Sequence, residues 1–182
     1  MQRQPILIKS AMTVGVVLVT NKSPLKARQA VETLARFFRR EFDYDFTNYE
    51  ASGRTPDCEA WLWTQRDWET GHDRLIATGH AVFWKQESAW MLGSVWQHPY
   101  FRGKGRLSRV WPFWVEHYGA FWIDPPLSYG MEGFLRQSDH VLPDGHRVQE
   151  WLSPTTPGPS SVTTENVTGD SHLVGRTSSA GS

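Results

Sequence analysis

The segment with the strongest chemical signal runs from residue 98 to residue 108, with the sequence HPYFRGKGRLS. Pro99 has no N–H to donate and therefore ends a strand. Gly103 and Gly105 let successive backbone N–H groups converge, and a helix starting there adds its positive N-terminal end. Cationic side chains that strengthen hydrogen bonds to an anion are Arg102, Lys104 and Arg106. The segment predicts a phosphate site, and the alternative is an exposed basic turn that caps a helix.

Two better-known phosphate loops match this segment less well. A P-loop requires Gly-x4-Gly-Lys-Ser/Thr, and here Arg106 and Leu107 follow Gly105. The dinucleotide pattern Gly-x-Gly-x-x-Gly meets Ser108 at its third glycine and requires a parallel βαβ unit. Because the preceding strands are predicted to form hairpins, we interpret the dinucleotide match as accidental.

The elements that position this loop follow from the hydrophobic pattern. Short β-branched runs predict strands at residues 6–8 and 14–19, and Ser23 and Pro24 predict the N-cap and first position of a helix. Apolar residues from Ala27 to Phe42 then recur at helical spacing. Three strand-like runs follow at residues 59–66, 74–85 and 89–96. Their links are too short for parallel crossovers, so antiparallel hairpins are expected, with the third strand central.

After the loop, the pattern predicts a helix at residues 105–118, a strand at 120–123 and a helix at 127–137. The resulting order is β, α, three antiparallel β, α, β, α. This order predicts an α/β (α+β) fold with a mixed, mostly antiparallel central sheet flanked by helices.

Composition limits the classes of partner. Ten Trp among 182 residues supply a substantial core. Nineteen Lys and Arg balance nineteen Asp and Glu, which argues against a nucleic-acid or anionic-membrane partner. The longest apolar run is too short to span a bilayer, and no secretory pattern starts the chain. With Cys58 as its only cysteine, the chain is expected to be cytoplasmic. Residues 1–152 are predicted to form one domain, followed by a disordered Ser-, Thr-, Pro- and Gly-rich tail at 153–182.

The sequence VWQHPYFRGKGRLS at residues 95–108 resembles a motif of the GNAT superfamily, the Gcn5-related N-acyltransferases that use acetyl-CoA. The resemblance extends over roughly residues 61–135 and implies a GNAT-like fold. It implies that Val95, Trp96 and Gln97 present main-chain groups to the pantetheine arm and the acyl carbonyl. The backbone groups it assigns to the CoA pyrophosphate belong to Arg102, Gly103, Lys104, Gly105, Arg106 and Leu107. Leu107 departs from the family pattern, which has a small residue at that position.

The resemblance also suggests catalytic residues. Many family members carry an Asn after the next strand and, seven residues later, a Tyr that protonates the departing CoA thiolate. Ser128 occupies the first position, but Leu135 occupies the second. Tyr129 is the nearest substitute, and the alternative is that Tyr129 only packs.

Asp124 and Pro125 are similar to an Asp-Pro pair in the cohesin acetyltransferase branch of the family. Because acyl transfer requires a neutral amine, a carboxylate in reach of the amine is chemically apt. Asp124 is therefore the first candidate for the base, and a turn or N-cap Asp is the alternative. One cysteine cannot supply a Cys2His2 zinc finger, and no metal site is expected.

Three hypotheses for function follow. The first is an N-acetyltransferase that moves an acetyl group from acetyl-CoA to a primary amine by direct attack in a ternary complex. Its acceptor would be a small molecule or a protein, and the chain could form a homodimer. The second is a catalytically weakened CoA-binding module on the same fold, and the third is a protein-interaction module with an aromatic docking surface.

Overall fold

The computed structural model describes residues 6–7, 15–53, 57–67 and 75–153. The predicted tail lies outside these residues apart from Ser153. The elements are, in chain order, β1 (Ile6–Leu7), β2 (Gly15–Val19), α1 (Leu25–Phe42), β3 (Cys58–Arg66), β4 (Leu75–Gln86), β5 (Ala89–Gln97), the 3-10 helix η2 (Pro99–Phe101), α2 (Arg106–Tyr118), β6 (Phe121–Ile123), α3 (Tyr129–Leu135) and α4 (Val148–Leu152). No helix in the described part of the chain is long and apolar enough to cross a membrane.

The strands form one sheet in the order β2-β3-β4-β5-β6, and β1 pairs with β4. All pairs are antiparallel except β5 with β6, which run parallel because α2 crosses between them. The predicted mixed, mostly antiparallel α/β sheet is confirmed. The preceding strands do form antiparallel hairpins, as predicted, but this does not exclude the dinucleotide pattern, because β5, α2 and β6 form a parallel βαβ unit after them. Only Ser108 at the third glycine still separates the loop from that pattern.

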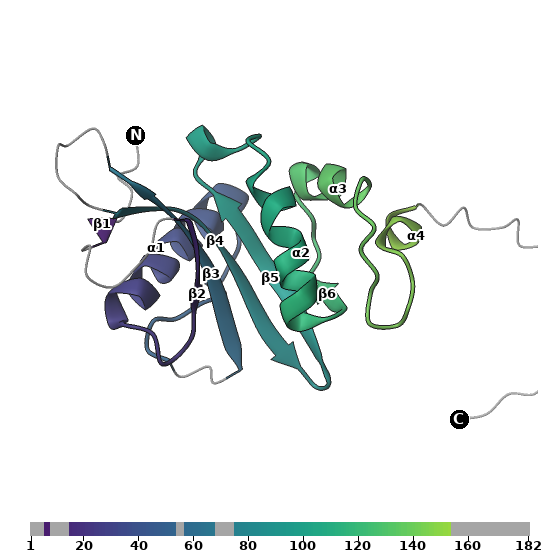
Figure 1. The fold of residues 1–182 in the computed structure, drawn as a ribbon, viewed down its shortest axis with the longest axis horizontal. Coiled ribbons are helices and arrows are strands. Elements are labelled where there is room, and N and C mark those ends of the chain that lie inside the picture. Colours follow the sequence, from purple (N-terminus) through teal and green to yellow (C-terminus); the bar gives the residue numbers. More distant parts are fainter. Residues whose placement is uncertain (1–5, 8–14, 54–56, 68–74, 154–182) are drawn as a thin grey trace, which may run out of the picture.

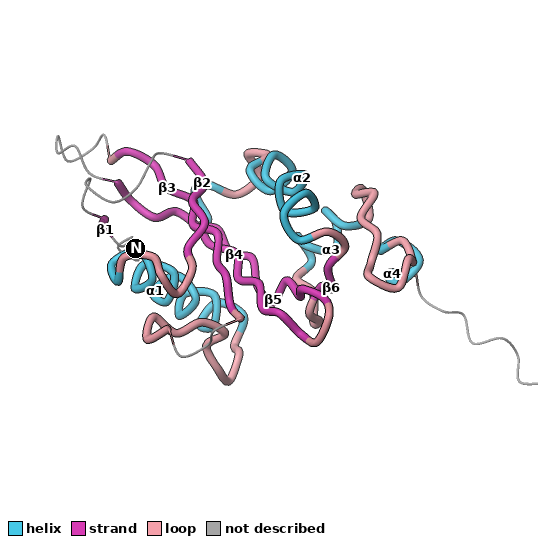
Figure 2. The backbone as a smooth tube through the Cα atoms, turned by 60° about the horizontal axis from the view of Figure 1, so that its bottom comes forward, coloured by secondary structure: helices cyan, strands magenta, loops and turns pink. Residues whose placement is uncertain are grey.

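The two long helices cover opposite faces of the sheet (Figures 1 and 2). The apolar face of α1, including Val31 and Leu34, packs against residues such as Leu62 and Val82 of β3 and β4. Aromatic residues dominate the other face, where Trp114 of α2 is fully buried. A sheet buried on both faces in this way provides a rigid base for the loop that follows β5.

Three local expectations differ from the structure. Ser23 does not cap α1, because its hydroxyl accepts a hydrogen bond from the Thr20 N–H instead, and Pro24 occupies the N-cap. The central strand is β4 rather than β5, as the strand order shows. It is also more buried than β5, because β6 is too short to cover all of β5. The short helix α4 was not expected; it follows a turn closed by the bridge between Val141 and Arg147.

The edge of β5 that faces β6 loses its neighbouring strand after Leu92. Pairing with β6 ends at Leu92 and Ile123, and the register with β4 shifts so that Gly93 has no partner residue. This β-bulge lies under the ring of Trp84. A Cβ atom at Gly93 would come within 2.1 Å of that ring. Glycine is therefore required at this position by close packing.

We predict that Gly93→Ala destabilises the fold by about 1–3 kcal/mol, because Trp84 must move to admit the methyl group. Chemical denaturation measures the change. Gly133→Ala in α3 is the matched control, since nothing lies within 4 Å of a Cβ there. Wild-type stability in the Gly93 variant would contradict the packing described above.

His80 on β4 is fully buried between α1 and the sheet. Its Nε2 atom lies 3.3 Å from the Ser94 hydroxyl, and its Nδ1 atom has no partner among the described residues. Burial lowers the pKa of His80 from 6.5 to about 3. Because a lowered histidine pKa disfavours protonation of the folded state, the stability contributed by the neutral ring decreases as pH falls below 6.5.

We predict that acidification from pH 7 to pH 5 lowers the free energy of unfolding by about 2 kcal/mol through His80, because the ring protonates in the unfolded chain and stays neutral in the folded one. Denaturation at the two pH values, compared between wild type and His80→Gln, isolates this term. The variant should lose correspondingly less stability on acidification. An NMR titration in which the His80 ring protonates near its ordinary pKa would refute the assignment.

Candidate functional site

Two cavities lie side by side along the free edge of β5. The loop cavity, of about 470 Å³, lies beside the segment from Arg102 to Ser108. The Asp124 cavity, of about 400 Å³, lies between the end of α1 and the segment after β6. Four residues line both cavities: Phe42, Val95, Ser128 and Met131. The two cavities therefore form one continuous groove.

The loop cavity is bordered by unpaired backbone N–H groups. Gly103 and Gly105 both adopt left-handed conformations, with φ of 69° and 65°, which a glycine adopts without strain. Across the described residues, no acceptor is found for the backbone N–H groups from Gly103 to Ser108. The first three belong to the loop and the last three to the first turn of α2, which has no intrahelical acceptors for them. This arrangement suits an anion.

The cationic side chains of the loop are largely held by the protein itself. Arg102 forms a two-pronged ion pair with Glu41, in which both N···O distances are 2.7 Å. Arg106 points back to the sheet, where it donates to Thr78 and Gln65 at 2.9 Å each. Lys104 lies with its Nζ atom 4.2 Å from the centre of the Tyr100 ring. An anion in this cavity would therefore meet backbone N–H groups first.

Most of the residues predicted to bind the cofactor line the loop cavity. They are Val95, Trp96, Gln97, Arg102, Gly103, Gly105, Arg106 and Leu107. Lys104 is not among the lining residues. The backbone N–H of Arg102 is already used, because it donates to the Pro99 carbonyl at 3.2 Å. Leu107 lines the cavity with part of its side chain and packs against the core beneath α2 with the rest.

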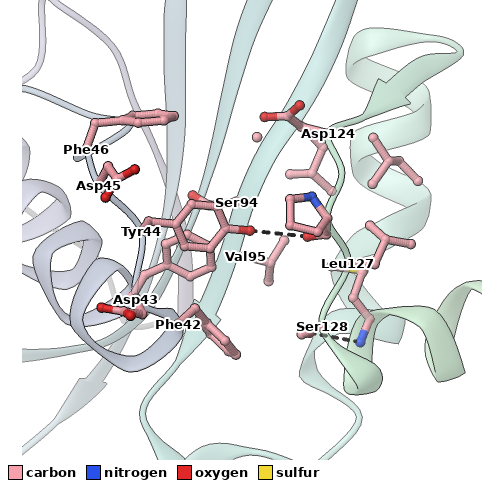
Figure 3. Close-up of a pocket in the computed structure, with 16 residues that line it drawn as sticks. Phe42, Asp43, Tyr44, Asp45, Phe46, Ser94, Val95, Asp124, Leu127 and Ser128 are labelled. Atoms are coloured by element: carbon pink, nitrogen blue, oxygen red, sulfur yellow. Dashed lines mark hydrogen bonds between the residues drawn. The ribbon is translucent and has the colours of Figure 1, made fainter.

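Asp124 lines the Asp124 cavity on the wall that faces the end of α1 (Figure 3). Its backbone N–H donates to the Leu92 carbonyl at 3.0 Å, which extends the parallel ladder by one bond and fixes the position of the residue. Partial burial raises the pKa of the Asp124 carboxyl above 3.8. A carboxylate with a raised pKa is a better proton acceptor than an ordinary aspartate.

The opposite wall is formed by residues 42–46, with the sequence FDYDF, at the end of α1. Tyr44 stacks on Phe38 and donates its hydroxyl proton to the Pro126 carbonyl, 3.2 Å away across the cavity (Figure 3). Burial, followed by the charge of Asp124, raises the pKa of Tyr44. Among the described lining residues of this cavity, three are aspartates and none is basic, so the cavity favours a cation.

The other two catalytic candidates occupy different surroundings. Ser128 lies where the cavities meet, and its oxygen accepts a hydrogen bond from the Met131 N–H at 3.3 Å as the N-cap of α3. Its hydroxyl proton remains available to a ligand. Tyr129 lines only the loop cavity and is 93% exposed, so it does not share a cavity with Asp124. Leu135 is fully buried in the core.

Sequence reasoning missed the contribution of α1 and the loop that follows it. No role was assigned from the sequence to Glu41 or to residues 43–46. The available signal was the alternation of aromatic and acidic residues in FDYDF, which is unusual for a solvated loop. Ser94, on the bulged part of β5, also lines the Asp124 cavity and was missed.

Comparisons with known proteins found distant structural matches and no sequence match. No protein-family model and no curated protein sequence matches the chain. A ribosomal-protein-alanine N-acetyltransferase from Brucella melitensis biovar Abortus 2308 is 15% identical, with a TM-score of 0.45 over 66% of this chain and 87% of its own. The xEco2 acetyltransferase domain bound to a K105-CoA conjugate is 11% identical, with a TM-score of 0.48 over 75% and 92%.

A third structure, the aminoglycoside acetyltransferase meta-AAC0020 from an uncultured soil metagenomic sample in complex with sisomicin, is 9% identical. Its TM-score is 0.42 over 88% of this chain and 95% of its own. Identities and TM-scores this low transfer no substrate or activity to the chain. All three structures are named as acetyltransferases. The order of elements predicted from the sequence is present around a mixed, mostly antiparallel sheet, so the predicted α/β fold class is confirmed.

Proposed function

We propose that the protein is an acetyl-CoA-dependent N-acetyltransferase that acts on a primary amine. The observation that carries this proposal is the continuity of the groove. One end offers unpaired N–H groups to an anion, the other offers carboxylates to a cation, and the free edge of β5 joins them. A donor with a diphosphate at one end and a thioester at the other fits such a groove.

The residues present suit the parts of acetyl-CoA. The N–H groups between Gly103 and Ser108 would hold the diphosphate. The backbone of Val95, beyond the last pairing with β6, offers its N–H and C=O at the free edge of β5 to the amides of the pantetheine arm, whereas the main-chain groups of Trp96 face β4. The thioester would then lie near Val95, where the two cavities meet.

The acceptor amine would enter through the Asp124 cavity. Its acidic lining attracts the ammonium form, and Asp124 takes the proton that must leave before the nitrogen can attack. The nitrogen then bonds to the thioester carbonyl carbon and gives up its second proton, the bond from that carbon to sulfur breaks, and the thiolate takes up a proton and leaves as the free thiol. A carboxylate whose pKa is raised by burial suits the first of these proton transfers.

Two measurements distinguish this enzyme from a CoA-binding module that lacks turnover. A rise in melting temperature with acetyl-CoA reports binding, and release of free thiol in the presence of an amine reports transfer. Binding with amine-dependent thiol release supports the enzyme. Binding without release supports the module, and no thermal response rejects both.

We predict that Gly105→Asp weakens acetyl-CoA binding tenfold or more. Aspartate tolerates the left-handed conformation and has open space around it, so the variant should fold, while its charge repels the diphosphate. Calorimetry measures the affinity. Gly105→Asn has nearly the same shape without the charge, and it should bind clearly better than the Asp variant. Equal affinities of the two variants would reject this loop as the anion site.

We predict that Asp124→Asn lowers turnover by a factor on the order of 10² to 10⁴, the usual effect of removing a positioned base. Affinity for acetyl-CoA and melting temperature should stay close to wild type. In the wild type the rate should rise with pH through the raised pKa of Asp124, because only the ionised carboxylate accepts a proton. The variant should lose this acidic limb. If the variant keeps both the limb and most of the rate, Asp124 is not the base.

A further inference from the structure

Glu41, in the last turn of α1, connects three parts of the molecule. Its two carboxylate oxygens each bind the Arg102 guanidinium at 2.7 Å, and one of them also accepts the indole N–H of Trp96 at 2.7 Å. The third guanidinium nitrogen of Arg102, Nε, donates to the Gln97 carbonyl at 2.8 Å. One carboxylate thus connects α1, the end of β5 and the start of the loop.

The position of this carboxylate is electrostatically unfavourable in two respects. A negative charge in the last turn of a helix opposes the helix dipole. Glu41 also lines the loop cavity, where the proposed donor carries its diphosphate. The bond to Arg102 holds the pKa of Glu41 below its ordinary value of 4.5, so the group remains charged. A carboxylate that stays charged beside a proposed anion site must serve the site in a way other than by attracting the anion.

We propose that Glu41 is a positioning residue for the anion site, acting through Arg102 and Trp96 to fix the course of the backbone from Gln97 into the loop. Fixing that course directs the N–H groups that follow Arg102 into the loop cavity. This inference rests on the proposed binding of acetyl-CoA. It also assigns the side chain of Arg102 to the loop framework rather than to direct contact with phosphate.

Two effects of opposite sign make the proposal testable. Removing the Glu41 charge reduces repulsion of a diphosphate and releases the Arg102 cation, so electrostatics alone predicts tighter binding. Loss of positioning predicts weaker binding, because the loop must then be ordered by the ligand itself. The side chains of Arg102 and Glu41 are 41% and 33% exposed, so their pair should contribute little to global stability.

The test compares Glu41→Gln with wild type for two donors, acetyl-CoA and acetyl-pantetheine, which lacks the diphosphate. We expect KM for acetyl-CoA to rise tenfold or more, with kcat, melting temperature and KM for acetyl-pantetheine nearly unchanged. Arg102→Gln should raise KM for acetyl-CoA similarly, and the double variant should be no worse than either single one. Glu32→Gln is the matched control, because Glu32 pairs with Arg36 on the same helix outside both cavities.

Unchanged or tighter binding of acetyl-CoA by Glu41→Gln would overturn the proposal. Equal weakening of both donors together with a fall in melting temperature would also overturn it, because Glu41 would then be a general structural residue. If the wild-type chain itself binds no acetyl-CoA, the proposed function fails, and this inference fails with it. That result is visible before any variant is made.

Discussion

The site depends on the point at which β5 loses its second neighbour. Three parallel pairs and the bond from the Asp124 N–H to the Leu92 carbonyl complete the ladder with β6. Beyond them, β4 is the one partner of β5 among the strands that the structure describes. A free strand edge in the middle of a protein exposes peptide groups that require partners. Both cavities lie along this edge, so the end of one short ladder sets the position of the whole groove.

The charges along the groove are separated by this geometry. The anion end is formed mainly by backbone N–H groups at the start of α2, whose directions are fixed by helix and loop geometry. The cation end is formed by carboxylates from two segments, Asp43 and Asp45 on one wall and Asp124 on the other. The opposite electrostatic potentials at the two ends attract an anionic group to one end and a cationic group to the other before close contacts form.

Much of the fold was predictable because it depends on local patterns. Alternating and continuous apolar runs located β3, β4 and β5 within one or two residues, and the two glycines predicted the left-handed turns of the loop. The contact between Glu41 and Arg102 was not predictable, because the two residues are 61 positions apart in the sequence. The bulge at Gly93 was missed for the same reason. It is determined by a Trp84 ring on the neighbouring strand, and no local pattern encodes that contact.

The wall formed by residues 42–46 has a consequence for how such a protein can diversify. Its middle residues belong to neither a helix nor a strand, so replacing them interrupts no strand ladder and no segment of the anion loop. The opposite end of the groove is constrained by the start of α2 and by two left-handed glycines. Mutation can therefore remodel the acidic, aromatic end while the loop at the other end stays the same. Divergent copies of this chain could differ in the group admitted at the acidic end while sharing the same loop at the other end.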